Sequence, residues 1–431
     1  MTLTVLTDTQ IKSILENLTL PELQAALDAL RSALHEYSTG SQNSSIHQPE
    51  RTSVNSAATG ATTLFMPSSS SVGTGVKVIT LSSTPSQDLP NIKPTGAITL
   101  FSPRGTPVGF LHASTLTAFR TALASLCLVS RRDKVTNLTV FGTGEQAYWH
   151  VRLTLLLRGH GVRSVNFVNR TFSDSCREIL RRFLTEVPSE TRKKEGWEGT
   201  ARFEVLTRTH SEYERLLEKG LLESDVIFCC TPSREPLWDG GWLTGREGRR
   251  RGRLIVAIGS WTREMREIPG EVIRLALGKG GHGHGHGHHH HHWHKHAVEG
   301  GVVVVDTLDG ALKEAGELIE AGVGAEELVE LGELVMLSQI ILAESEGGSR
   351  PEEGGSHHES EEKGEEELEE EEVELGDNSR KKAGDKHLAK WLQSGNVIYK
   401  SVGLGLMDLT VGMHVVKLAK KKGVGSHIEG F

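Results

Sequence analysis

Hydrophobic residues recur with helical spacing at the start of the chain and with strand spacing after it. A short apolar run at Leu3–Leu6 predicts a strand, and the leucines and isoleucines up to Tyr37, which recur every three or four positions, predict two amphipathic helices. Residues 39–56 are rich in Ser, Asn and Gln and predict a loop. A helix is predicted at Thr115–Val129. The segments between loop and helix predict strands at Thr62–Met66, Gly75–Leu81, Gly96–Phe101 and Pro107–Leu111, with turns at Ser68–Thr74 and Ser82–Lys93. Together these elements predict a small α+β domain.

Beyond residue 136 the pattern changes to buried strands that alternate with helical segments. Apolar runs occur near 138–141, 164–168, 202–206, 225–229, 254–258 and 302–305. Such alternation predicts a parallel, doubly wound sheet. After two low-complexity stretches, an ordered segment at 394–403 leads into a final helix at Leu406–Lys420. We expect this end to pack back on the N-terminal domain and to make that domain discontinuous.

These patterns divide the chain into a few parts. Residues 1–120 form the first part of the α+β domain, residues 121–344 form the parallel-sheet domain, and residues 387–431 return to the first domain. A His/Gly-rich insert lies at 278–296, and an acidic low-complexity insert, expected to be disordered, lies at 345–386. No mixed ligand set accompanies the histidines, so we predict no functional metal site.

Charge and cysteine content narrow the functional classes. The net charge of the 431 residues is −8, but most of the acidic excess lies between Glu352 and Asp377. The folded remainder therefore lacks the strongly basic face expected for a nucleic-acid partner. The four cysteines show neither metal-ligand spacing nor a disulfide framework, which favours a reducing, cytoplasmic location. We expect no secretory leader, because the first residues show no basic region followed by an apolar one. We expect no membrane span, because no apolar run reaches roughly eighteen residues.

The clearest chemical signal follows the first strand of the predicted parallel sheet. The run Leu138–Phe141 leads into Gly142-Thr143-Gly144 and then into a segment that is helical from Glu145 onward. The first glycine permits a tight turn, the second lets the backbone approach a pyrophosphate, and a small residue at Ala147 lets the helix pack on the strand. The N-terminus of that helix then points at the phosphates. This order of strand, glycines and helix predicts a dinucleotide-binding site.

The end of the next strand indicates which dinucleotide binds. The apolar run at 164–168 ends at Asn169-Arg170-Thr171, where NAD-specific sites usually carry an acidic residue for the ribose 2′-hydroxyl. No acidic residue stands at this strand end, and an Arg at such a position accommodates a 2′-phosphate. The sequence therefore favours NADP(H), with NAD(H) as the alternative.

A series of ordered stretches resembles the ornithine cyclodeaminase/mu-crystallin family over nearly the whole chain outside the two inserts. These stretches are PERTSV (49–54), GVKVIT (75–80), STLTAFRTALAS (114–125), FGTGEQA (141–147), FVNRTFSDS (167–175), DVIFCCTPS (225–233), VAIGSWTREMREIP (256–269), VVVVDT (302–307) and KSVGLGLMDL (400–409). The resemblance implies a Rossmann-type sheet inserted into a discontinuous α+β domain that binds substrate and forms a homodimer.

The resemblance also implies the site residues. Arg51, Lys77 and Arg120 stand at the substrate positions of the family, and an Arg fork and a Lys point charge suit the carboxylate of an imino or amino acid. Thr99 is a further candidate, and Lys77, with Arg120 beside it, is the expected group to assist protonation. The expected cofactor residues are Gly142, Thr143, Gly144, Glu145, Gln146, Asn169, Arg170, Thr171, Thr231, Pro232, Ser233, Gly259, Ser401, Val402 and Gly403.

One departure from the family separates the candidate reactions. Members that cyclise ornithine resemble one another in a Gly-Gly-Asp or Gly-Ala-Asp step whose Asp is an acid/base, but here the step is Gly259-Ser260-Trp261. Glu264 or Glu267, in the same loop, could substitute for that Asp, but we interpret both as solvated or helix-start carboxylates. Cyclodeamination needs a positioned proton-transfer group, whereas imine reduction needs a bound carboxylate, a protonated C=N and a hydride donor.

The missing carboxylate and the NADP-type strand end both favour reduction. The sequence therefore predicts an NAD(P)H-dependent reductase of ketimines derived from amino acids, including cyclic imino acids. Two alternatives stay open at this point: an ornithine cyclodeaminase that forms proline and ammonia, and a non-catalytic, mu-crystallin-like protein that binds NADP and a small ligand.

Overall fold

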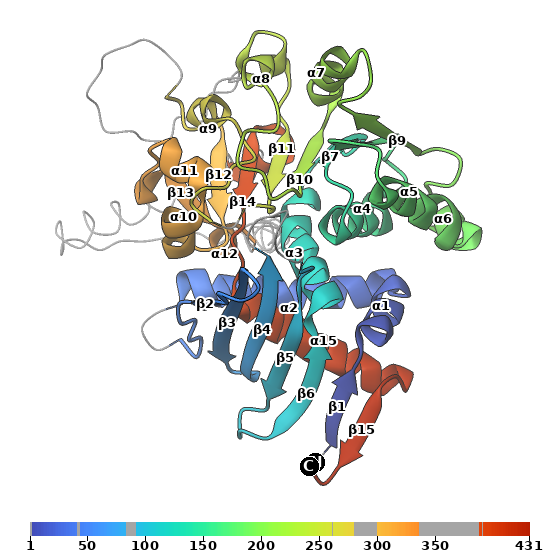
Figure 1. Ribbon diagram of the computed structural model, residues 1–431, viewed down its shortest axis with the longest axis vertical. Helices are drawn as coiled ribbons and strands as arrows, with labels where there is room; N and C mark the ends of the chain where they lie inside the picture. Colours follow the sequence, from blue (N-terminus) through green and yellow to red (C-terminus); the bar gives the residue numbers. More distant parts are fainter. Residues whose placement is uncertain are drawn as a thin grey trace, which may run out of the picture.

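The computed structural model describes residues 2–40, 44–82, 92–260, 262–279, 300–335, 388–389 and 391–431. Trp261, nearly all of the His/Gly-rich insert and the acidic insert lie outside the described residues. The described chain forms two sheets, one above the other in Figure 1, and helix α3 (Ala113–Val129) runs from one to the other.

The smaller sheet has seven strands in the order β15-β1-β6-β5-β4-β3-β2. They are β1 (Thr2–Leu6), β2 (Thr52–Asn55), β3 (Ala61–Ser70), β4 (Gly73–Ser82), β5 (Thr95–Phe101), β6 (Pro107–His112) and β15 (Ser426–Glu429). The predicted turn at Ser68–Thr74 is wrong in extent, because β3 and β4 stay paired as far as Ser70 and Gly73. The predicted loop at 39–56 contains β2, which pairs with β3. Pairing satisfies the backbone N–H and C=O groups of these polar stretches whatever their side chains.

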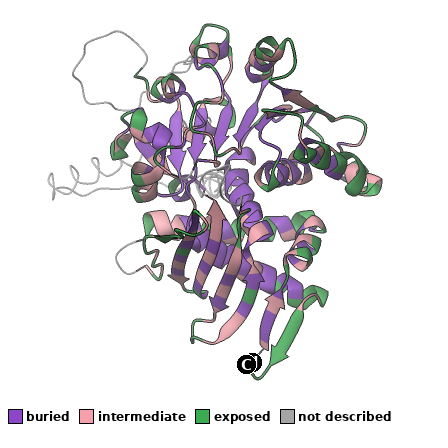
Figure 2. Ribbon diagram, viewed as in Figure 1, coloured by how far each residue is buried: buried purple, intermediate pink, exposed green. Residues whose placement is uncertain are grey.

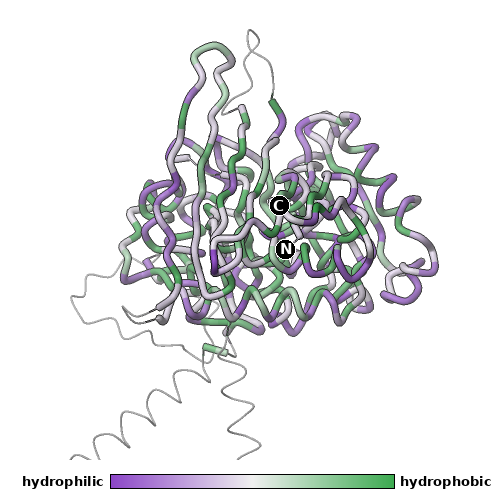
Figure 3. The backbone as a smooth tube through the Cα atoms, turned by 90° about the horizontal axis from the view of Figure 1, so that it is seen from below, coloured by the Kyte–Doolittle hydropathy of each residue, from purple (hydrophilic) through white to green (hydrophobic). Residues whose placement is uncertain are grey.

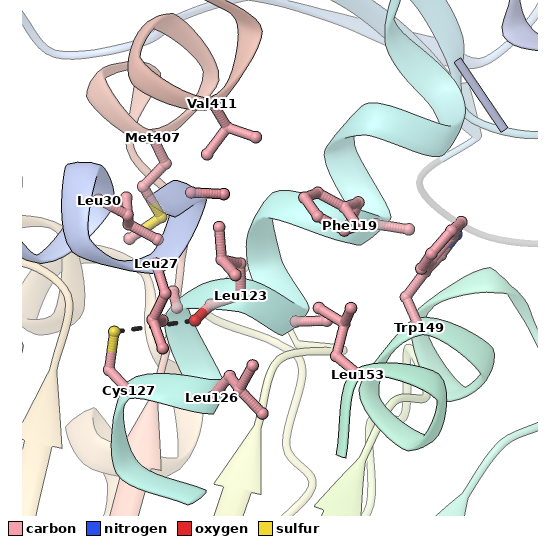
Figure 4. Close-up of a cluster of buried hydrophobic side chains, with 14 of the residues drawn as sticks. Leu27, Leu30, Phe119, Leu123, Leu126, Cys127, Trp149, Leu153, Met407 and Val411 are labelled. Atoms are coloured by element: carbon pink, nitrogen blue, oxygen red, sulfur yellow. Dashed lines mark hydrogen bonds between the residues drawn. The ribbon is translucent and has the colours of Figure 1, made fainter. Parts of the chain in front are cut away.

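Helices cover one face of this sheet, and no described helix covers the other face. The covering helices are α1 (Asp8–Glu16), α2 (Leu20–Thr39), α3 and α15 (Gly405–Lys422). Capping boxes at Thr7 and Thr19 start the first two of them. Figure 4 shows leucines of α2 and α3 packed with Met407 of α15. On the opposite face, Phe65 and Phe110 are exposed by 38% and 46%.

The larger sheet has eight strands, all parallel, in the order β13-β12-β14-β11-β10-β7-β8-β9. They are β7 (Asn137–Phe141), β8 (Ser164–Asn169), β9 (Arg202–Thr207), β10 (Val226–Cys229), β11 (Leu254–Ala257), β12 (Val302–Val305), β13 (Leu328–Glu330) and β14 (Val397–Lys400). The central strands are buried along their whole length (Figure 2). Their alternate residues enter two separate cores: Val226 and Phe228 one, Ile227 and Cys229 the other. The predicted parallel, doubly wound sheet is therefore confirmed.

Shorter helices and turns connect these strands. They are α4 (Glu145–Arg158), α5 (Asp174–Arg181), a π-helical turn (Arg182–Glu186), α6 (Ser189–Lys194), α7 (Tyr213–Glu223), α8 (Gly241–Thr244), α9 (Gly270–Ala276), α10 (Leu308–Glu314), α11 (Gly316–Glu320) and α12 (Leu331–Leu334), with 3₁₀ turns at Gly248–Arg250 and Ala325–Glu327.

A strand from the last part of the chain completes the larger sheet. β14 lies between β11 and β12 and pairs with both, so the domain boundary predicted at 387 comes too early. The strand fits there because its side chains pack into both hydrophobic cores. Tyr399 lies in one core and Ile398 lies in the other. Only α15 and β15 return to the smaller sheet, where β15 pairs with β1 and brings the two chain ends together (Figure 3). The boundary predicted at 120 falls inside α3, which packs on strands of both sheets.

Candidate cofactor and substrate site

A cavity of about 930 Å³ is lined by residues of both sheets. One side consists of the turn after β7 and the segments that follow the carboxyl ends of β8 to β11 and β14. The other side consists of β3, β4 and α3. Open α/β sheets bind ligands at the carboxyl ends of their parallel strands. A ligand at that position here would also contact the smaller sheet.

The turn after β7 has the geometry that a pyrophosphate requires. Gly142 has a φ of +100°, and a Cβ there would lie 3.0 Å from the carbonyl oxygen of Cys230, so only glycine fits without strain. Gly144 is the N-cap of α4, no side chain caps that helix, and a Cβ at Gly144 would meet nothing within 4 Å. The open space in front of unsatisfied N–H groups fits the pyrophosphate of a nicotinamide dinucleotide.

Two arginines lie at the ends of neighbouring strands on this side. Arg170 follows β8, Arg208 follows β9, and both line the cavity together with Asn169. The sequence analysis missed Arg208, although its position directly after the third strand of the pattern was visible. Thr171 is not among the lining residues, and its carbonyl accepts a hydrogen bond from Nδ2 of Asn169 at 3.1 Å.

Glu145, expected at the cofactor, is engaged elsewhere. Its Oε1 lies 2.6 Å from Nη1 of Arg182, a side chain only 4% exposed that also contacts Glu16 at 3.2 Å. The guanidinium stacks on the ring of Tyr148 at 3.2 Å from the ring centre. Glu145 does not line the cavity, so the structure places it in an ion-pair network that joins α1 to α4.

The opposite side of the cavity carries two buried cations and their counter-ion. Lys77 of β4 and Arg120 of α3 line the cavity although they are only 2% and 4% exposed. Asp408 of α15 bridges them: its Oδ2 lies 2.7 Å from Nζ of Lys77 and its Oδ1 accepts from Nε of Arg120 at 3.1 Å. Burial lowers the pKa of Lys77 to about 8, against the opposing attraction of Asp408.

The third predicted substrate residue, Arg51, lines the cavity and also contacts residues that belong to the larger sheet's domain. Its Nε donates to Glu314 of α10 at 2.9 Å, and its Nη1 donates to the carbonyl of Val402 at 3.1 Å. Burial raises the pKa of Glu314. Thr99 is not among the lining residues: it alternates with Ile98 and Leu100, which are buried on the helix-covered face of β5.

The segment after β14 closes the cavity beside Arg120. Asp306 accepts hydrogen bonds from Oγ of Ser401 and from the backbone N–H of Gly403, both at 2.7 Å. Gly403 has a φ of +92°, and a Cβ there would lie 2.9 Å from Nη2 of Arg120. Glycine therefore leaves room for the guanidinium to reach the cavity.

A buried carboxylate binds the backbone of the loop at Gly259-Ser260, the loop in which cyclising members of the family carry an Asp. The carboxylate of Glu267 accepts hydrogen bonds from the backbone N–H groups of Thr231, Gly259 and Ser260 at 2.8, 2.7 and 3.1 Å. Burial and the nearby Glu317 raise its pKa to about 8. The interpretation of Glu267 as a solvated carboxylate is therefore wrong, because it organises two cavity-lining segments from within the core.

The neighbouring side chains confirm that this loop turns its polar group inward. Ser260 is fully buried and its Oγ donates to Glu317 at 2.9 Å, while its carbonyl accepts from Nζ of Lys400 at 2.7 Å. Gly259 lines the cavity, but neither Glu264, which is exposed, nor Glu267 does. Among the described lining residues, Glu235 is the one carboxylate.

Comparison with known proteins identifies the fold family. Residues 7–213 match the profile of the ornithine cyclodeaminase/mu-crystallin family. The chain is similar to this family over just under half of its length. An uncharacterised protein of Saccharomyces cerevisiae is 24% identical over 365 residues, 80% of this chain and 90% of its own length.

Solved structures share the fold across the whole chain. The Δ1-pyrroline-2-carboxylate reductase of Thermococcus litoralis, solved with NADH and L-proline, is 19% identical, with a TM-score of 0.63 over 99% of this chain and 100% of its own. An archaeal alanine dehydrogenase dimer with bound NAD is 18% identical, with a TM-score of 0.61 over the full length of both chains. The chain therefore shares its fold with nicotinamide-dependent imino-acid reductases and with cyclodeaminases.

Most predicted site residues line the cavity described above. Besides those described above, the lining includes the following predicted positions: Thr143, Gln146, Thr231, Pro232, Ser233, Gly259, Ser401, Val402 and Gly403. The sequence analysis missed Arg208, Asp408 and Glu314. Asp408 had a visible signal, because it is a lone carboxylate in an apolar run that was predicted as a helix. The described residues contain no group of three or more potential metal ligands and no helix long and apolar enough to cross a membrane.

Proposed function

We propose that the protein is an NADPH-dependent reductase of ketimino acids with a single carboxylate, cyclic imino acids included. The observation that supports this most strongly is the pair of buried cations, Lys77 and Arg120, in the wall of the cavity that also holds the glycine turn. Leu64, Met66 and Ile79 line the cavity on the same sheet, which suits the methylene groups of a ring.

Each side chain has a defined task in this reaction. Arg120 holds the substrate carboxylate through its Nη groups, and Lys77 protonates the imine nitrogen from Nζ. Arg51 adds a third positive charge at the rim of the same site. Residues after the glycine turn would hold a nicotinamide dinucleotide, which when bound supplies a hydride to the imine carbon.

The preference for NADPH rests on the two strand-end arginines. Arg170 and Arg208 both line the cavity at the end expected for the adenosine ribose, where an acidic residue would otherwise select NAD. Two guanidinium groups at neighbouring strand ends suit a 2′-phosphate.

Cyclodeamination of ornithine is the second candidate. It requires a proton-transfer group at the substrate, and Glu235, which is exposed and lines the cavity, is the described carboxylate that could serve. Ammonia released from ornithine with catalytic NAD⁺, and abolished by Glu235→Gln, would favour this reaction. Cofactor binding without turnover of any imine or amino acid would favour the third possibility, a ligand-binding protein.

We further propose a homodimer formed through the open face of the smaller sheet. That face carries the exposed side chains of Val54, Phe65 and Phe110 on β2, β3 and β6, and exposed apolar side chains on one face of a sheet suit a protein interface. The structurally similar alanine dehydrogenase is described as a dimer.

The test of the proposed function is an assay with purified protein, NADPH or NADH, and either piperideine-2-carboxylate or pyrroline-2-carboxylate. We expect reduction of at least one imine with NADPH, and about a tenfold loss of NADPH affinity in Arg170→Ala and in Arg208→Ala, with NADH affinity little changed. Failure to reduce these and related imino acids would refute the reductase. Equal losses for both cofactors would refute the NADPH preference.

A further inference from the structure

Asp408 occupies an unusual position for a carboxylate. It lies in the first turn of α15, within the apolar run Leu404–Leu409, and is only 1% exposed. Its two oxygens contact different cations, Lys77 of β4 and Arg120 of α3, at 2.7 and 3.1 Å. Asp408 does not line the cavity itself. It therefore acts on any ligand only through these two side chains.

We propose that Asp408 is a positioning residue that keeps Lys77 protonated and aims the Nη edge of Arg120 at the substrate carboxylate. This inference rests on the proposed function, because it explains how the proton donor of that reaction is maintained. Asp408 accepts from Nε of Arg120, and Nη1 donates to Sδ of Met407 at 3.5 Å. Nη2 lies against Gly403, which lines the cavity, so this edge of the guanidinium is turned toward the ligand. The N-terminal turn of α15 further favours a negative charge at this position.

The charges around Lys77 decide its protonation. Asp408 on α15 favours the charged form, while Arg120 on α3 and Arg51 before β2 disfavour it, as does burial. The resulting pKa of about 8 lies just above neutral pH, so Lys77 is mostly protonated at pH 7 and loses its proton as the pH rises through 8. Without the carboxylate only the three unfavourable influences remain, and the pKa must fall.

The step balances with these groups. The imine carbon accepts the hydride supplied by the reduced nicotinamide, and its nitrogen takes the proton of Lys77 Nζ as the C=N double bond becomes a single bond. The products are the amine, the oxidised cofactor and a neutral Lys77 amine, which recovers a proton from water. Asp408 stays ionised throughout.

The test compares ligand binding and turnover over a range of pH. The probe is pyridine-2-carboxylate, a flat ring with one carboxylate, titrated by calorimetry into the NADP⁺-saturated full-length protein. We expect its affinity for the wild type to fall as the pH rises through about 8, and that fall to begin about one to three pH units lower in Asp408→Asn. The alkaline limb of kcat/KM for an imine should move by the same amount.

Matched variants separate positioning from simple structural support. Asp408→Glu retains the charge and should restore the wild-type pH dependence. Glu22→Gln removes another carboxylate that contacts α15, the partner of Lys422 at 3.1 Å, and should shift nothing. Asp408→Ser replaces the Asn variant if the latter does not fold. A uniform loss of affinity at every pH, with no shift, would overturn the inference, whereas absence of binding by every form would refute the proposed function instead.

Discussion

The two sides of the cavity present positive charge in different ways. On the dinucleotide side, the turn Gly142–Gly144 offers backbone N–H groups at the start of α4, and its residues are consecutive in the chain. On the carboxylate side, Lys77, Arg120 and Asp408 are buried side chains from three separate elements, and 288 positions separate the last two. The first side needs little room and no counter-ion. The second needs a counter-ion, because buried cations are costly unless they are paired.

Because of this difference, mutations and changes of pH should affect ligand binding differently on the two sides. A site made of backbone responds to changes in shape, since its partial charges do not titrate. A site made of buried charges responds to the loss of any one member, because the remaining charges are then left unpaired.

The largest effect is expected from Lys77→Met. The variant removes the proton donor and leaves Asp408 with Arg120 alone, so kcat/KM for the imine should fall about 10²- to 10⁴-fold while NADPH affinity stays close to that of the wild type. Steady-state kinetics and a cofactor titration measure both quantities. The control is Lys134→Met, an exposed lysine whose side chain is 60% accessible. A loss of tenfold or less would show that Lys77 is not the donor.

Alanine at each glycine of the turn should separate stability from binding. Gly142→Ala places a side chain at a φ of +100° against Cys230 and should lower the free energy of unfolding by about 1–3 kcal/mol. Gly144→Ala meets open space at a φ of −90°, so it should fold like the wild type yet weaken the cofactor about tenfold, because its methyl group occupies the approach to the pyrophosphate. Urea unfolding and cofactor titration of both variants decide. Similar losses of stability in the two would contradict the backbone role assigned to Gly144.

The same contrast explains which parts of the site could be predicted from the sequence. The turn at Gly142 and the alternation of strands and helices were predictable because each depends on neighbouring residues. Lys77 and Arg120 were reached only through the family resemblance, since no local pattern marks them. Their counter-ion Asp408 was missed because the predicted return of the last helix to the smaller sheet does not say which of its residues faces β4 and α3.

Other errors have the same origin. Glu267 follows a polar loop and resembles a solvated residue, but the chain folds over it so that three backbone N–H groups need its oxygens. Glu145 starts a helix as predicted, but its carboxylate forms an ion pair with Arg182, which lies in the next βα unit. The strand β14 was assigned to the wrong sheet because its partners, β11 and β12, precede it on the far side of the acidic insert. Each outcome depends on tertiary contacts that single-sequence patterns do not encode.

The smallest effect concerns pH below neutral, where the two sides should again differ. His150 of α4 is buried behind the glycine turn, its Nε2 2.9 Å from Oγ of Ser125, and burial lowers its pKa from 6.5 to about 4. Between these values the unfolded chain binds a proton that the folded chain does not, so stability is complete above pH 6.5 and falls by about 1.4 kcal/mol per unit below it. At pH 5.5 the wild type should therefore lose about 1.3 kcal/mol that His150→Gln retains, as urea unfolding at pH 7.5 and 5.5 would measure. Carboxylate binding, governed by Lys77 and its pKa of about 8, should not change over this interval. Equal losses of stability in both proteins would show that His150 is not the group responsible. A parallel loss of carboxylate binding by the folded protein would contradict the distinction between the two sides, since only the side built from buried charges should respond through Lys77.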